Sequence, residues 1–231
     1  MDWRGSFCSA GRLKSETGNI NLWSVMIHLT AKYYNLFIML FALLSTGCAA
    51  QLPYDQQMAD LPKGPICRVA VLPFLNKSDF TLAGAIFSKV FAAQLHRASN
   101  YLLIQEGDIL QAYQQLKILP MRKPSREQFQ IIASRASAQL LITGTVLDMR
   151  ENPDEHSTVN PLLIVDIQII DGRNGEVIWT TFHQRHGSEY KKIMHIGTIH
   201  TVTGLSRQVA DEIINIWFEK GLKQCNVSPQ S

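Results

Sequence analysis

Residues 162–186, LLIVDIQIIDGRNGEVIWTTFHQRH, determine the fold class of this 231-residue chain. They predict two long strands, residues 162–170 and 176–186, joined by a turn over residues 171–175. The Asn-Gly pair in that turn favours a tight hairpin, because both residues tolerate positive φ angles. Every second residue of the first strand is apolar, which predicts a sheet face that helices must cover. These face residues are Leu163, Val165, Ile167 and Ile169.

The segments around this hairpin alternate between strand and helix patterns. Short apolar runs predict strands at residues 66–74, 101–105 and 138–149. Apolar residues at spacings of three and four predict helices at residues 82–98, 108–116 and 198–222, and Ser125 is positioned to cap a further helix. The order is β-α-β-α-α-β-β-β-α. It predicts a single α/β domain with a mixed β-sheet and helices packed on it.

The amino-terminal region carries the pattern of a bacterial lipoprotein signal. Apolar residues 36–44 run into Ser-Thr-Gly-Cys48-Ala-Ala, and small residues before a cysteine suit a peptidase that cuts there. The Cys48 thiol would then carry a diacylglycerol and its new amino group a fatty acyl chain such as palmitate. Ser45 departs from the usual apolar residue three positions before the cysteine. The alternative is a transmembrane anchor, but nine apolar residues fall short of the ~20 that a bilayer requires.

This pattern divides the chain into four parts. Residues 1–47 are the predicted signal peptide, and Met26 is the expected true start, because residues 26–47 alone have the usual basic start and length. Residues 48–65 form a lipidated tether that is polar and interrupted by prolines, and its 17 residues after the cysteine would span about 55–60 Å when extended. Residues 66–225 form the periplasmic domain, and residues 226–231 are a short tail.

Charge and cysteine content narrow the class of protein. The full chain has 22 Lys and Arg against 19 Asp and Glu, and the excess is concentrated in residues 1–47. A nearly balanced domain without basic runs gives no reason to expect nucleic-acid binding. Besides Cys48, only Cys67 and Cys225 remain after processing, and such a pair in an exported protein favours a disulfide. Two separate buried thiols are the alternative.

No pattern of catalytic or metal-binding residues emerges. His183 and His186 are three apart on a predicted strand, which places them on opposite faces, and no cysteine or carboxylate cluster accompanies them. We therefore expect solvated or loop histidines and no metal. Phosphate-cradling loops and nucleophile elbows are not found. The chain is predicted to be a non-enzyme without cofactors.

Five short motifs, in order, resemble a known superfamily. They are VAVLPFLNKSD (69–79), GAIFS (84–88), YLLIQE (101–106), ASAQLLITGTV (136–146) and NGEVIW (174–179). Together they are similar to the domains typified by the amino-terminal domain of TolB and by the lipoproteins CsgG, FlgO and LpoB. The resemblance covers residues 66–222. Ala136-Ser-Ala replaces the usual Leu-Gly-Ala before the third strand, which leaves the closest subfamily open.

The resemblance implies a non-enzymatic accessory lipoprotein of an envelope machine for secretion, flagella or peptidoglycan synthesis. Ala49 and Ala50 lack the aspartate that retains lipoproteins in the inner membrane, so the resemblance implies an outer-membrane anchor with the domain facing the periplasm. A protein partner is expected, and contact candidates are the hairpin tip, Arg173 and Asn174, and a segment after the hairpin. That segment is Tyr190, Lys191 and Lys192. The alternative function is a subunit of a homo-oligomeric, CsgG-like secretion assembly.

Overall fold

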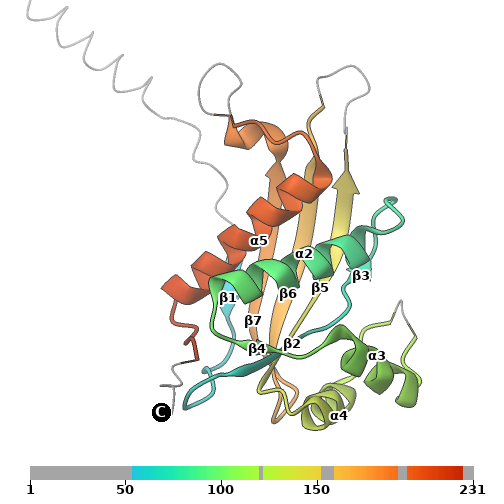
Figure 1. Ribbon diagram of the computed structural model, residues 1–231, viewed down its shortest axis with the longest axis vertical. Helices are drawn as coiled ribbons and strands as arrows, with labels where there is room; N and C mark the ends of the chain where they lie inside the picture. Colours follow the sequence, from blue (N-terminus) through green and yellow to red (C-terminus); the bar gives the residue numbers. More distant parts are fainter. Residues whose placement is uncertain (1–53, 120–121, 152–158, 192–196, 226–231) are drawn as a thin grey trace, which may run out of the picture. The chain divides into compact units, whose positions relative to one another are not determined.

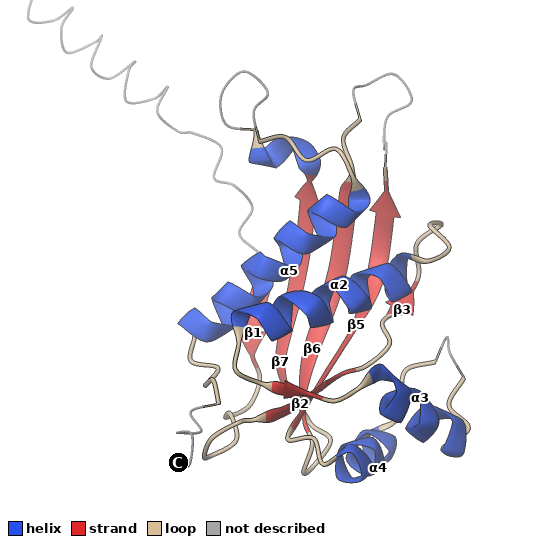
Figure 2. Cartoon of the chain, in the orientation of Figure 1, coloured by secondary structure: helices blue, strands red, loops and turns tan. Residues whose placement is uncertain are grey.

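The computed structural model describes residues 54–119, 122–151, 159–191 and 197–225. Within them, seven strands form one mixed sheet in the order β1-β7-β6-β5-β2-β4, and β3 pairs with β5 (Figures 1 and 2). The strands are β1 (Tyr54–Gln57), β2 (Arg68–Val71), β3 (Leu75–Asn76), β4 (Leu102–Leu103), β5 (Leu140–Arg150), β6 (Leu162–Asp171) and β7 (Val177–His186). The helices are α2 (Ala83–Ala98), α3 (Glu106–Gln115), α4 (Arg126–Ala136) and α5 (Val202–Glu219), with a 3-10 turn η1 (Gly187–Tyr190). The predicted mixed α/β class is confirmed.

The long hairpin forms as predicted and is the centre of the sheet. β6 and β7 pair antiparallel from Leu162 opposite His186 to Ile170 opposite Val177, with a bulge near the turn. β5 pairs antiparallel with β6, whereas β2 runs parallel to both β5 and β4. The turn needs its glycine, because Gly175 has φ +68° and a Cβ there would lie 2.4 Å from the Arg126 carbonyl oxygen.

Helices α2 and α5 cover one face of the sheet and build the larger core (Figure 1). The apolar face predicted for β6 lies here, because Leu163, Val165, Ile167 and Ile169 are all buried in this cluster. On α5, Trp217 is fully buried and makes an edge contact with Phe91 of α2, with ring centroids 5.6 Å apart. These contacts fix the two helices across the central strands.

Helices α3 and α4 cover only one end of the opposite face. Their buried residues, among them Ile109, Phe129 and Ile132, pack on Ala70 of β2 and Leu141 of β5 in a second, smaller core. The rest of that face, over β5, β6, β7 and β1, is not covered by any described helix, although Lys123 of the segment before α4 reaches over it and donates to the Gln168 side chain. The two faces of the sheet therefore differ in what can contact them.

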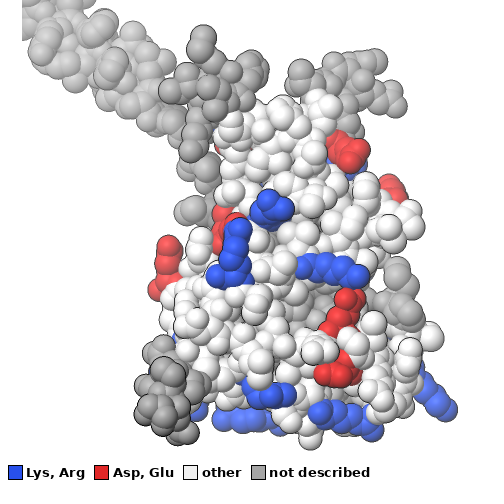
Figure 3. All heavy atoms as spheres, viewed as in Figure 1, with Lys and Arg blue, Asp and Glu red and all other residues white. Residues whose placement is uncertain are grey.

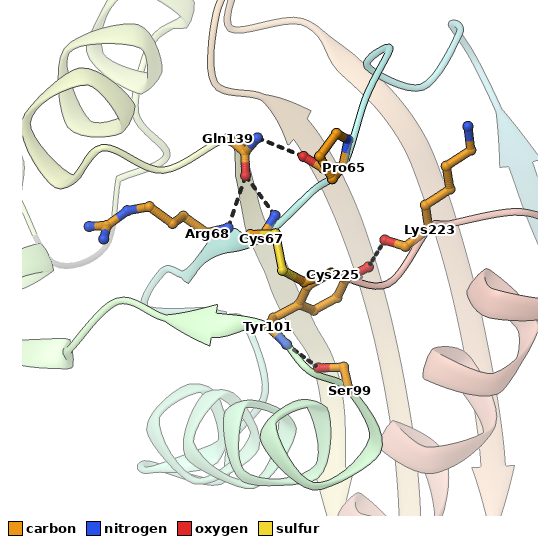
Figure 4. Close-up of a disulfide and its surroundings, with 8 residues drawn as sticks. All are labelled: Pro65, Cys67, Arg68, Ser99, Tyr101, Gln139, Lys223 and Cys225. Atoms are coloured by element: carbon orange, nitrogen blue, oxygen red, sulfur yellow. Dashed lines mark hydrogen bonds between the residues drawn. A yellow bond between two sulfur atoms is a disulfide. The ribbon is translucent and has the colours of Figure 1, made fainter. Parts of the chain in front are cut away.

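A disulfide joins Cys67, beside β2, to Cys225, which follows α5 (Figure 4). It is supported by the hydroxyl of Tyr101, which donates to the Lys223 carbonyl at 2.7 Å. The Gln139 amide accepts from the backbone nitrogens of Cys67 and Arg68 at 2.6 and 3.0 Å. The first core strand and the end of the last helix are thus held together covalently.

Two predictions for the amino-terminal half are corrected. The prediction that residues 49–65 lack strand structure is wrong at Tyr54–Gln57, which form β1 and pair antiparallel with β7. The strand predicted at residues 66–74 is interrupted after β2, which ends at Val71, and β3 follows beyond the predicted range, at Leu75–Asn76. Pro73 explains the interruption, because proline has no N–H to donate to a sheet ladder.

The predicted cap of the third helix is confirmed. The Ser125 hydroxyl accepts from the Gln128 backbone N–H, and the Gln128 side chain accepts from the Ser125 N–H, which is a complete capping box. None of the described helices combines the length and apolar character needed to span a bilayer.

Candidate functional site

Strand β1 is attached to the sheet by the carboxylate of Asp55, whose side chain is 2% exposed. Its Oδ1 accepts from Trp179 Nε1 at 2.7 Å and from Thr181 Oγ1 at 2.6 Å, and its Oδ2 pairs with Lys220 Nζ at 2.8 Å. Trp217 Nε1 donates to the same Thr181 hydroxyl at 2.8 Å. One acid on β1 therefore satisfies buried donors of β7 and binds a cation at the end of α5.

The hairpin tip, the first predicted contact site, is held by its own side chains. The Asp171 carboxylate, 3% exposed, accepts from the Arg173 guanidinium at 2.7 and 3.1 Å and from the Arg173 backbone N–H at 2.9 Å. Burial alone would raise the pKa of Asp171, but these hydrogen bonds outweigh it, and the pKa lies below its ordinary value. Arg173 is itself exposed, so it stabilises the turn and still reaches solvent.

Asn174 lies against the start of α4. Its carbonyl accepts from Arg126 Nε at 2.8 Å, and the Arg126 guanidinium pairs with Glu176 at 2.6 Å. The Asn174 amide also donates to Glu176 and accepts from the Glu176 backbone N–H. The tip is consequently a rigid surface built from the hairpin and α4 together.

A hollow of about 560 Å³ opens beside this tip. Its volume falls within the range of small-molecule pockets, roughly 300–1,000 Å³. Small residues line it, including Ala133, Ser134 and Gly172, and the cations Lys63 and Arg173 contribute to its lining. Lys and Arg side chains also gather along the lower border of the molecule in Figure 3, the end of the view where α3 and α4 lie. The sequence placed Arg173 near a surface but did not predict the hollow, because α4 and the segment before β2 complete it.

The second predicted contact segment is partly packed into the domain. Tyr190 is half-buried, and burial is the main reason why its pKa lies above the ordinary range, with the nearby Glu212 carboxylate adding to the effect. Its hydroxyl is buried without a hydrogen bond of regular geometry. Lys191 is exposed, whereas Lys192 and Cys48 lie outside the described residues.

A partly buried acid, Glu212, lies between α5 and β7. Glu212 Oε2 is 2.8 Å from His183 Nε2 and 3.1 Å from Arg185 Nε. Burial would raise the pKa of Glu212, but the hydrogen bonds to its carboxylate, first that of His183, lower it to about 2. The expectation of a solvated histidine is wrong for His183, which is fully buried. It faces α5, and no signal in the sequence near residue 183 pointed to a partner 29 positions later.

The uncovered face of the sheet is the surface that sequence reasoning missed. Cross-strand pairing aligns one row of residues over five strands, and this row contains aromatic, acidic and hydroxyl side chains. From β1 to β3 the row is Tyr54, Phe182, Asp166, Thr145 and Leu75. Knowing which face lacks helices requires the placement of α2 to α5, which periodicity alone does not give.

The described residues offer few groups arranged for catalysis or metal binding. A cavity of about 80 Å³ lies at the ends of β2 and β4, where Lys89 and Glu106 approach to 3.7 Å. That volume is well below the roughly 300 Å³ of ordinary ligand sites. Among the described residues, no three His, Cys, Asp or Glu side chains gather as a metal site would require. The hollow beside the hairpin tip and the uncovered face are therefore the two surfaces of interest.

Comparisons with known proteins give fold-level likenesses. No family model matches the sequence, and no curated protein matches it. Among solved structures, the PelC dodecamer from Paraburkholderia phytofirmans aligns at 16% identity with a TM-score of 0.47, covering 70% of this chain and 96% of that one. Lipoprotein GNA1162 from Neisseria meningitidis aligns at 15% identity with a TM-score of 0.48, covering 66% and 99%.

The carboxy-terminal domain of LpoB from Escherichia coli is a further structural neighbour. It aligns at 19% identity with a TM-score of 0.39, covering 52% of this chain and 82% of that domain. The structural neighbours thus include LpoB, one of the lipoproteins named in the sequence resemblance. These likenesses concern the arrangement of helices and strands, and the function has to be argued from the residues of this chain.

Proposed function

We propose that this chain is a non-catalytic outer-membrane lipoprotein whose periplasmic domain docks a protein partner of an envelope machine. The observation that carries the proposal is the short spacing between Cys48 and the sheet. Tyr54 already belongs to β1, so six residue steps separate the lipidation candidate from the folded body. At about 3.3–3.6 Å per residue, the segment from Cys48 to Tyr54 spans no more than about 22 Å. The domain would work directly beside the leaflet.

The disulfide between Cys67 and Cys225 supports an exported location, because such bonds persist in oxidising compartments. Ala49 and Ala50 follow the cysteine in place of an aspartate that would retain the protein at the inner membrane. Both observations favour an outer-membrane anchor with the domain in the periplasm.

The partner site that we favour is the hollow beside the hairpin tip. The tip lies at the beginning of β7, whereas β1 starts beside Phe182, further along the same strand. The hollow is thereby separated from the attachment point of the tether. Its small side chains admit a protruding segment, and Lys63 and Arg173 favour a partner surface with acidic or carbonyl groups.

The lipid anchor is tested by metabolic labelling with palmitate and by membrane fractionation. We expect wild-type protein to carry label and to fractionate with the outer membrane. Cys48→Ala should lose both properties. Label retained by Cys48→Ala, or soluble wild-type protein in the cytosol, would contradict the proposal.

The docking site is tested by site-specific photo-crosslinking in intact cells. A photoreactive residue at Ser134, exposed on α4 and part of the hollow, is compared with one at Ala85, exposed on α2. We expect a discrete protein adduct at position 134 and none at position 85. A ladder of adducts between copies of the chain would instead indicate a homo-oligomeric assembly, and equal labelling at both positions would refute a specific site.

A further inference from the structure

Two aromatic side chains lie opposite each other at the open edge of the uncovered sheet face. Tyr54 of β1 pairs with Phe182 of β7, and the two side chains are 60% and 37% exposed. Phe182 cannot point to the helices, because Thr181 and His183 on either side of it face α5. Rings so exposed are typical of surfaces that contact a partner or a membrane interface.

The neighbouring positions make this region amphipathic rather than purely apolar. Ile164 of β6 is half-buried in the next row, opposite Gln184, and Gln168 and Thr180 occupy the row on the other side. Asp166, opposite Phe182, accepts a hydrogen bond from the Thr180 hydroxyl at 3.2 Å. Aromatic rings among amide and hydroxyl groups suit the headgroup level of a leaflet, where one end of the side chain is apolar and its surroundings are wet.

The short segment between Cys48 and Tyr54 indicates what this face contacts. The six steps from Cys48 end at Tyr54, which is itself one of the two exposed aromatics. A lipid-modified Cys48 would hold Tyr54 within about 22 Å of the acyl chains, whatever path the intervening residues take. Leu102 on β4, another exposed apolar residue, lies at the opposite edge of the sheet.

We propose that the uncovered sheet face, around Tyr54 and Phe182, rests on the lipid leaflet that carries the anchor. This inference rests on the proposed function, because it requires the lipid at Cys48. The contact orients the domain. The edge of the open face around Tyr54 and Phe182 meets the headgroups, and α2 and α5 lie on the far side of the sheet. Because α3 and α4 stand on the other end of the same face, they hold the hairpin tip away from the leaflet, where it remains accessible to a protein.

The test uses a tryptophan reporter and quenching lipids. The lipidated chain, purified from membranes, carries Phe182→Trp and is reconstituted into vesicles of phosphatidylethanolamine and phosphatidylglycerol with or without brominated acyl chains. The two native tryptophans after Cys48 are Trp179 and Trp217, which are 1% and 0% exposed, so their emission is a background that wild-type protein measures and that direct contact with lipid should change little. Leu102→Trp is the matched control, because Leu102 is also an exposed apolar residue on an edge strand.

We expect the emission of Phe182→Trp to shift to the blue in vesicles and to be quenched by the brominated lipid. Wild-type protein and Leu102→Trp should show little quenching. The effect should be lost in the unlipidated Cys48→Ala background. This combination would support a lipid-facing sheet.

Three results would overturn the inference. Lipidated, vesicle-bound Phe182→Trp without quenching would show that the face does not meet the leaflet, and it would leave the proposed function intact. A concentration-dependent blue shift without vesicles would mean that a second copy covers the face. Equal quenching of Leu102→Trp would mean that contact with lipid is not specific to this face. Absence of lipid on wild-type protein would instead refute the proposed function itself.

Discussion

Removing the disulfide between Cys67 and Cys225 should be the most destabilising covalent change available in this domain. The two residues are 158 positions apart. In the chain-entropy model, a loop of that length removes about 17 cal/mol/K from the unfolded chain, or about 5 kcal/mol at 25 °C. Domains of this size are stable by about 5–15 kcal/mol in total, so the bond would supply a large share.

The double variant Cys67→Ala/Cys225→Ala measures the contribution of the disulfide to stability, because alanine leaves no thiol that could form another disulfide. Equilibrium urea unfolding, followed by circular dichroism, should show a lower midpoint and a free energy of unfolding reduced by about 3–5 kcal/mol. Wild-type protein treated with dithiothreitol should approach the same midpoint, and the double variant should not respond to the reductant.

A loss below about 1 kcal/mol, with native circular dichroism retained, would refute the loop-entropy reasoning for this chain. It would imply that the unfolded ensemble already keeps residues 67 and 225 close together. The hydrogen bond between Tyr101 and the Lys223 carbonyl, which does not depend on sulfur, would then be the main attachment of the chain after α5.

Three further predictions concern single side chains. Asp55→Ala should destabilise the domain by about 1–3 kcal/mol for each buried donor left unpaired, Trp179 Nε1 and Thr181 Oγ1, and Asp55→Asn should cost less; urea midpoints measure both. Ser125→Ala removes half of the capping box and should cost about 1 kcal/mol in the same assay. The pKa of Glu212 is lowered from 4.5 to about 2, so its ionised form stabilises the fold above pH 4.5. That contribution, at most about 3 kcal/mol, should disappear as the pH falls from 4.5 to 2. In Glu212→Gln the free energy of unfolding should therefore depend less on pH over this range than in wild-type protein. An equal pH dependence in both proteins would contradict the assignment.

Local signals in the sequence predicted the parts of the fold that depend on near neighbours. The hairpin of β6 and β7 follows from alternation and an Asn-Gly turn, and the start of α4 follows from Ser125. The buried face of β6 was also predicted, because every second residue is apolar. Each of these features is determined within about a dozen residues, which is the range over which periodicity and capping act.

Features that depend on distant residues were not predictable in the same way. β1 shows no apolar alternation, since its one inward side chain is the Asp55 carboxylate, and that acid is acceptable only because Trp179, Thr181 and Lys220 surround it. His183 was expected in solvent, and it is buried because Glu212 of α5 provides a partner. The sequence pattern predicts a polar tether at Asp55 and a solvated His183, although tertiary hydrogen bonds bury both side chains.

The arrangement of the two candidate surfaces along β7 has a consequence for how the protein would act. Val177, next to the turn, and Phe182, beside β1, are five residues apart, which corresponds to about 17 Å along a strand. Leaflet contact around Phe182 and partner contact at the hollow near Gly172 therefore need not compete for the same side chains. Because β7 and β6 are paired between them, the distance from the leaflet contact to the partner would be set by the length of a strand and not by a flexible tether. A longer linker inserted between Cys48 and Tyr54 should then weaken leaflet contact while leaving crosslinking at Ser134 unchanged, which separates the two surfaces experimentally.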